Sequence, residues 1–189
     1  MSNIEIDNNA NENGFKSKAA LVVSIFAMVL ALSNIGSSNA SGEATEQNIL
    51  ASNVYSFFQA KNIRQTQFKL SADSLEIALS NSEKLNPATK AVMEKKLEAY
   101  KKTIERYESE PETGEGKKEL LLKAKEHEKL RDKAVLKDPW FDYAEGLLQV
   151  SIVLASVAIV TSTPVMLVGS VILGILGTLS TLNGYYLFF

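Results

Sequence analysis

Residues 143–161 read YAEGLLQVSIVLASVAIVT, and this apolar run decides the class of the protein. It contains one charged residue, Glu145, and has Gln149 one helical turn later. A helix of this length, rising ~1.5 Å per residue, extends about 28 Å, close to the ~30 Å hydrocarbon core of a bilayer. Trp140 and Tyr143 stand at its start, where aromatic residues collect at a membrane surface. The run therefore predicts a transmembrane helix.

Two further apolar runs stand at the two ends of the chain. Residues 165–189 are uncharged and end in a second aromatic cluster. The turn at 162–164 is too short for anything but an antiparallel helical hairpin with the preceding run. Residues 19–36, AALVVSIFAMVLALSNIG, follow Lys16 and Lys18 and predict a further span. We therefore predict an all-α membrane protein with three transmembrane helices, one N-terminal and two in a C-terminal hairpin.

The first apolar run has an alternative interpretation as a cleaved signal peptide. Its uninterrupted apolar core is short, two lysines precede it, and Ser38-Asn39-Ala40 resembles a small-x-small cleavage site. On this alternative the chain is cut near Ala40 and the mature protein has two spans. Both interpretations place Lys16 and Lys18 in the cytoplasm and send the following residues outward.

The charged residues are concentrated between the first and second spans. Of 20 Lys and Arg residues, 18 lie between Glu43 and Asp138, whereas a soluble domain distributes its charges over its whole surface. The pattern predicts a water-exposed insert between apolar ends. The expected segments are a disordered polar tail (1–18), a first transmembrane helix or signal anchor (19–36), an extramembrane helical bundle or coiled coil (37–142), a second transmembrane helix (143–162), and a turn with the third transmembrane helix (163–189).

The composition excludes several kinds of chemistry. The chain has no Cys, which excludes disulfides, thiolate metal sites and Cys nucleophiles, and its net charge of −2 provides no field for nucleic acid. His127, the only His, lies between two Glu residues on a charged helix and is expected to be solvated rather than bound to a metal. No nucleophile with a base and an orienting partner can be drawn, and no glycine-rich phosphate loop is present. We predict no catalytic residue, no cofactor and no metal, and hence no enzyme.

Three helices are expected in the insert. The polar stretch SSNASG at 37–42 predicts a flexible break, and the first helix is expected from about Ala44 to Ser80. Asn86-Pro87 predicts the start of a second helix, whose apolar residues alternate by four and three in a heptad seam. These seam residues are Met93, Leu97, Tyr100, Ile104 and Tyr107. After a turn at 111–116, a third helix is expected to fold back against the second as an antiparallel hairpin.

The stretch SNVYSFFQAKNIRQTQF at 52–68 carries adjacent aromatic and basic residues. Its apolar face is only about two turns long, which is short for a helix that lies on a membrane surface. We therefore expect Phe57 and Phe58 to dock on the 93–107 seam or on a neighbouring subunit, with Lys61 and Arg64 at the edge of the contact. Contact with the membrane is the alternative.

The hairpin helices each carry small residues on one face. Such faces let helix backbones approach closely in lipid, within the hairpin or between subunits. The residues are Ser151, Ala155, Ala158 and Ser162 on the second span, and Ser170, Gly174, Gly177 and Thr181 on the third. Glu145 and Gln149 are the polar intramembrane candidates, and Glu145 is close enough to the end of its span to lie among headgroups.

Two stretches, SFFQAKNIRQ at 56–65 and WFDYAEGLLQVSIVLASVAIVT at 140–161, together with the apolar ends, carry a family resemblance. From about Lys18 to Phe189 the chain resembles the bacterial membrane proteins grouped as domain of unknown function 4337. The resemblance implies a three-span inner-membrane protein with a helical insert and brings no catalytic residues. Members often have basic residues in the turn between the last two spans, and this chain has none at 161–164.

Orientation and function are expectations from these patterns. Lys16 and Lys18 place the N-terminus and the hairpin turn in the cytoplasm and the insert in the periplasm of a bacterial inner membrane; Arg131, Lys133 and Lys137 argue the opposite. We expect a non-catalytic, membrane-anchored protein that forms homo-oligomers and acts as a scaffold or binds an unidentified protein partner. An oligomeric channel or transporter subunit is the alternative from a different functional class.

Overall fold

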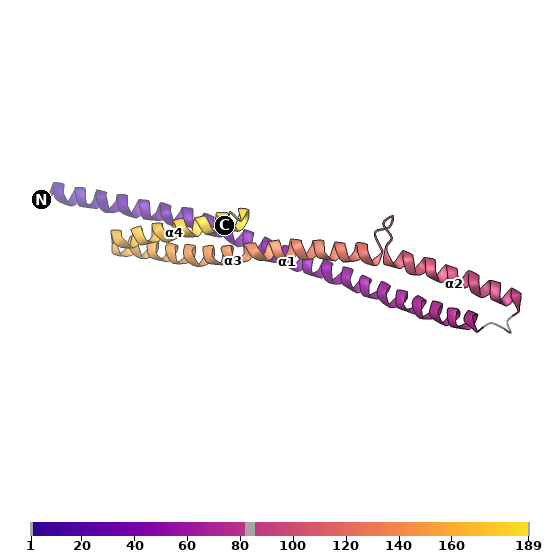
Figure 1. Ribbon diagram of the computed structural model, residues 1–189. Coiled ribbons are helices and arrows are strands. Elements are labelled where there is room, and N and C mark those ends of the chain that lie inside the picture. The colour runs from indigo at the N-terminus through magenta and orange to yellow at the C-terminus, as the bar shows by residue number, and fades with distance from the viewer. Residues whose placement is uncertain (1, 82–85, 189) are drawn as a thin grey trace. The chain divides into compact units, whose positions relative to one another are not determined.

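The computed structural model describes residues 2–81 and 86–188, with side chains from residue 13 onward. Within these ranges the chain is helical without strands, as predicted (Figure 1). The helices are α1 (Ser2–Ser80), α2 (Pro87–Glu108), α3 (Lys117–Thr161) and α4 (Pro164–Tyr186). The part of α1 from Asn13, α3 and α4 are each long and apolar enough to cross a membrane. The predicted all-α class with three candidate spans is therefore confirmed.

The chain divides into two compact units. The membrane unit comprises residues 1–45 and 131–189, and the insert unit comprises residues 46–130. α1 and α3 each contribute residues to both units, whereas α4 belongs to the membrane unit and α2 to the insert unit.

In the membrane unit, α1 lies antiparallel to α3 and parallel to α4. Ser33 donates a hydrogen bond to the Phe141 carbonyl at 3.5 Å, and Ser41, further along α1, donates one to the Asp138 carboxylate at 3.0 Å. The α3–α4 turn is tight, with Ser162 at φ 50° and Pro164 as the first residue of α4. The predicted C-terminal hairpin is therefore confirmed.

The core of the membrane unit forms where the three helices meet. Phe26 of α1 is 7% exposed and packs with Ala144 and Leu148 of α3, which are fully buried. Gly174 of α4 faces the Phe26 ring, and a Cβ at Gly174 would overlap that ring. The close packing of α4 on α1 therefore depends on the absence of a side chain at this glycine.

α1 has no break at Ser37–Gly42, and its backbone is helical through most of the stretch at 1–18 where a disordered tail was expected. The chain has no proline before Pro87, and a single glycine costs a helix only about 1 kcal/mol relative to alanine. Gly36 serves packing rather than bending, because a Cβ there would overlap the Phe141 ring. The sequence-based break was wrong because tertiary packing outweighs this small local preference.

α3 runs without interruption from Lys117 to Thr161 and contains Pro139. A proline inside a helix removes one backbone hydrogen bond, and helices that cross membranes tolerate it when neighbouring groups satisfy the backbone. Hydroxyl groups from the other two helices bond carbonyls next to the proline: Ser180 donates to Trp140 at 2.6 Å, and Ser33 donates to Phe141. The carbonyl that Pro139 leaves without its helix donor is that of Val135, so these bonds do not replace the missing one. They hold α3 against α4 and α1 beside the proline, and this packing outweighs the local cost of the proline.

In the insert unit, α2 and the first part of α3 follow one another along α1, and both run antiparallel to it (Figure 1). Contacts with α1 move steadily toward its N-terminal end as α2 and then α3 proceed. The pairs are Glu76–Lys101, Phe68–Tyr107, Gln65–Lys117 and Gln47–His127. The expected antiparallel hairpin of the second and third helices is therefore wrong. The segment between them, residues 109–116, projects outward as a bulge, and α3 then continues along α1 in the same direction as α2 (Figure 1).

The face of α1 toward α2 and α3 repeats every seven residues. Each position of this seam is buried or half-buried, in alternating steps of three and four. The α1 positions are Ala51, Val54, Phe58, Lys61, Gln65, Phe68, Ala72, Leu75 and Leu79. The insert unit is thus an antiparallel two-helix coiled coil. One helix, α1, is continuous, and the opposite helix is made of α2 followed by α3.

Candidate functional site

A polar cluster lies on α1 opposite the segment at 109–116, which interrupts the helix between α2 and α3. The Lys61 side chain is only 7% exposed, and its Nζ lies 3.3 Å from a Glu115 oxygen and 3.8 Å from a Glu110 oxygen. The same ammonium group lies 5.3 Å from the centre of the Phe57 ring and 5.4 Å from that of Tyr107. Two carboxylates and two ring faces thus compensate a nearly buried positive charge.

Gln65, one turn after Lys61, is 1% exposed and bonds both ends of the interruption. Its Nε2 donates to the Ile104 carbonyl at 2.9 Å and to Glu108 Oε2 at 3.0 Å, both on α2. Its Oε1 accepts from Lys117 Nζ on α3 at 2.9 Å. One side chain of α1 therefore fixes the end of α2 and the start of α3.

The outward bulge between the helices is closed by Glu119. Its carboxylate accepts from the Ser109 hydroxyl at 2.5 Å and from the Glu110 amide at 3.1 Å. The hydrogen bond from Ser109 is the main reason that the pKa of Glu119 lies below its usual value, and the bond from Gln65 likewise lowers the pKa of Glu108. A Cβ at Gly116 would overlap this same carboxylate, so the return of the chain depends on glycine here.

The lowered pKa of Glu119 predicts acid sensitivity of the bulge. Because the folded pKa lies below the ordinary value near 4.5, the stabilisation is complete above about pH 4.5 and is lost as pH falls through the folded pKa. Carbon-detected NMR titration should give Glu119 a midpoint below 4.5, and Ser109→Ala should move that midpoint upward. An unchanged midpoint in Ser109→Ala would show that the hydroxyl does not hold the carboxylate.

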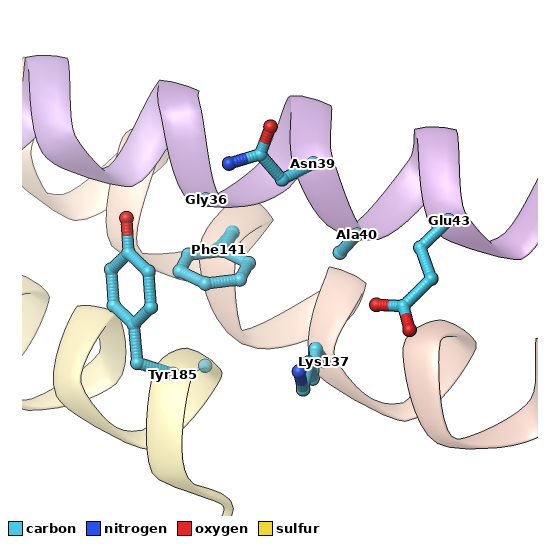
Figure 2. Close-up of a pocket in the computed structure, with 8 residues that line it drawn as sticks. Gly36, Asn39, Ala40, Glu43, Lys137, Phe141 and Tyr185 are labelled. Carbon is cyan, nitrogen blue, oxygen red and sulfur yellow. The ribbon is translucent and has the colours of Figure 1, made fainter. Parts of the chain in front are cut away.

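The membrane unit contains a small cavity at the level of its aromatic residues (Figure 2). Its volume is about 70 Å³, enough for a few water molecules and too small for a substrate. The lining residues are Gly36, Asn39, Ala40, Glu43, Lys137, Phe141, Gly184 and Tyr185. The Phe141 ring lies beside Gly36 (Figure 2), and the Tyr185 hydroxyl donates to the Leu32 carbonyl at 2.9 Å. These two contacts join the three helices at this end.

The small-residue faces meet inside the hairpin. Ser151 and Ser170 are fully buried, and each hydroxyl donates to the other residue's carbonyl at 2.7 Å. Ala155 and Ala158 are buried with them, whereas Ser162 is exposed in the turn. On α4 the buried residues include Gly174, Gly177 and Thr181. Ser170 and Gly177 lie at the α3–α4 contact, where a Cβ at Gly177 would overlap Leu148, whereas Gly174 faces Phe26 of α1.

The comparisons place the whole arrangement in one family. Residues 15–187 match the sequence model described as a domain of unknown function, DUF4337. The chain belongs to this family. The match spans both the polar cluster and the hairpin, and it confirms the resemblance. No curated protein matches the chain, and neither does any solved structure.

The residues of the predicted aromatic docking site differ in how deeply they are buried. Phe57 is 38% exposed against Lys61, Phe58 is half-buried with Lys117 Nζ 5.8 Å from its ring centre, and Arg64 is exposed. The ring that packs on the α2 seam is Phe68, 5.4 Å from Tyr100 and 5.9 Å from Tyr107. All five predicted seam residues of α2 are half-buried: Met93, Leu97, Tyr100, Ile104 and Tyr107.

Sequence reasoning missed Gln65, Phe68, Glu108 and Lys117. The seven-residue register that contains Phe58 and Lys61 also contains Gln65 and Phe68, so extending it could have found both. Glu108 and Lys117 gave no such signal, because they meet only through the fold.

The remaining predicted polar residues lie apart from the cluster. In the membrane unit, Glu145 is half-buried and Gln149 is exposed on α3. In the insert unit, His127 is half-buried rather than solvated, with its Nδ1 2.7 Å from Gln47 Oε1. Among the described residues, no group of three His, Asp or Glu side chains is arranged to hold a metal ion.

Proposed function

We propose that this DUF4337 member is a non-catalytic, membrane-anchored helical protein that assembles with copies of itself and serves as a scaffold or partner-binding subunit. The main support for the proposal is that the insert is only two helices thick and buries little apolar surface. The insert unit is a two-stranded coiled coil, and α2 contains no fully buried residue. Apolar side chains that remain half-exposed on a long coiled coil are typical of an assembly that further helices complete.

The bonding of the polar cluster supports a structural role. Gln65, Glu108 and Lys117 bond one another across the junction, and Lys61 pairs with Glu110 and Glu115 of the bulge. This arrangement positions helices. In the membrane unit, the hydroxyls of Ser151 and Thr178 bond backbone carbonyls, at Ser170 and Gly174. A hydroxyl that bonds a backbone carbonyl within the helices is not available to line a channel, so this bonding favours the scaffold over the channel alternative.

We further propose that the protein spans a bacterial inner membrane with the insert outside, and the contacts of the membrane unit identify which parts share one end. Phe26 of α1 meets Gly174 of the parallel helix α4, and Lys16 and Pro164 each lie ten residues earlier on these helices. Lys16 and the hairpin turn therefore lie at the same end of the unit. We assign this end to the cytoplasm by the rule that basic flanking residues stay inside, which directs the insert and the C-terminus to the periplasm.

The mass of the purified complex tests the proposal. We expect the detergent-solubilised protein to have a mass that is a multiple of its 20.7 kDa chain, with crosslinks between copies in native membranes. A strictly monomeric protein with no crosslinked partner would contradict it. The mass of the intact chain in the same experiment decides the signal-peptide alternative, because cleavage near Ala40 would lower that mass. Cleavage would also remove the part of α1 that packs on Gly174.

A further inference from the structure

The insert unit exposes a second apolar stripe on α1, opposite its seam. Four large aliphatic residues lie on it, each 55–62% exposed. They are Ile49, Ile63, Leu70 and Ile77, and Ser56 occupies the remaining position of the same seven-residue repeat. This position, outermost on a two-stranded coiled coil, is normally polar because it faces water.

The surface around this outer stripe is almost without charge. Its flanking positions in the insert unit are Glu46, Ser52, Asn53, Gln59, Ala60, Thr66, Gln67, Asp73, Ser74 and Ser80, all exposed, and Glu46 and Asp73 are the only charged residues among them. The partner helix α2 is different, since ten of its residues are charged: Lys90, Glu94, Lys95, Lys96, Glu98, Lys101, Lys102, Glu105, Arg106 and Glu108. Covering the α1 face would therefore desolvate almost no ion.

Three hydroxyl groups of this face already have hydrogen-bond acceptors within α1. Ser56 donates to the Ser52 carbonyl at 2.9 Å, Thr66 to Asn62 at 2.9 Å and Ser74 to Leu70 at 2.8 Å. A hydroxyl that bonds its own helix leaves no unpaired donor when another helix covers it. These hydroxyl groups therefore do not oppose burial of a face that carries little charge.

We infer that the outer stripe of α1 binds the same stripe of a second copy of this chain. The occupant must present an equally uncharged helix face with the same spacing, since a charged face would lose its water without gaining a partner. Within the described insert, α1 itself offers that face, whereas α2 is highly charged. The seven-residue repeat lets two such stripes align over their full length, and anchoring in one membrane raises the local concentration of copies.

This inference rests on the proposed self-assembly and names its surface. In the resulting dimer, α1 of each copy lies at the centre, with its seam toward its own α2 and α3 and its outer stripe toward the other copy. The charged helices then form the outside, which accounts for the unequal distribution of charge within the insert unit.

Single-cysteine crosslinking tests the surface directly, because the native chain has no Cys. The full-length protein, reconstituted in phospholipid vesicles, carries Ile63→Cys, Ile49→Cys or Ile77→Cys and is oxidised with copper phenanthroline. The matched control is Val92→Cys, an exposed aliphatic position of α2 that is 67% exposed. We expect at least about fivefold more disulfide-linked dimer from Ile63→Cys than from the control.

The other positions report the direction of pairing. Dimers from all three stripe variants indicate a parallel pair in register, and dimers from Ile63→Cys alone indicate an antiparallel pair centred on it. Yields equal to Val92→Cys for all three overturn the inference, as does quenching of a label at position 63 by spin-labelled lipid, which would place lipid on the stripe.

A charge-insertion variant separates this surface from the proposed function. Ile63→Lys with Leu70→Lys should keep the helical circular dichroism, because both positions are exposed, and should shift the complex to a smaller mass. If the native protein is oligomeric and this variant keeps the same mass, the surface is wrong and the proposed scaffold function remains. If the native protein is a monomer, both fail.

Discussion

Replacing Gly174 by leucine is expected to destabilise the membrane unit more than any other single change considered. A Cβ at this position of α4 already overlaps the Phe26 ring, so the larger side chain must push α1 and α4 apart. Overpacking of a close contact costs about 3 kcal/mol or more when neither backbone can yield. In a chain of this size, that corresponds to a drop of about 6–12 °C in the midpoint of thermal unfolding, measured in detergent.

Two companion variants isolate the cause of this loss. Gly146→Leu adds the same side chain on α3, where a Cβ meets nothing within 4 Å, and it should leave the midpoint nearly unchanged. Phe26→Ala makes room at the α1–α4 contact, so combining it with Gly174→Leu should recover part of the loss. A double variant that is as unstable as the sum of the two single changes would show that the ring is not the obstacle.

Gln65→Leu is expected to weaken the insert unit at the junction of α2 and α3. The substitution keeps most of the side-chain volume but removes the amide that bonds Ile104, Glu108 and Lys117. Loss of a buried network with charged members costs about 2–3 kcal/mol, which accelerates amide exchange by local opening roughly 30- to 150-fold. Hydrogen-exchange mass spectrometry should locate this change in peptides that cover residues 104–117.

A matched glutamine provides the control for the junction. Gln67 lies two residues further along α1 and is exposed, so Gln67→Leu should leave exchange at the junction unchanged. Equal acceleration in both variants would mean that α1 as a whole is loosened. No acceleration in Gln65→Leu would mean that its hydrogen bonds do not hold the two helices to α1.

The site was less predictable than the spans, and the polar cluster shows why. The sequence singled out Phe57, Phe58, Lys61 and Arg64 from local composition. Arg64 is nevertheless exposed, whereas Lys61 is nearly buried because Glu110 and Glu115 arrive from the bulge. Whether a lysine is buried depends on partners about fifty residues away in the chain, and a local pattern carries no information about them.

The sequence alone determined the all-helical class, the three apolar helices and the tight hairpin between the last two. These features follow from local rules, since lipid requires long uncharged helices and a very short connection forces neighbouring helices to be antiparallel. Tertiary structure alone decided that α1 continues through Gly36, that α3 continues through Pro139, and that α2 and α3 follow one another along α1. Glycine or proline changes helix stability by only about 1–3 kcal/mol, and contacts with distant helices outweigh that preference.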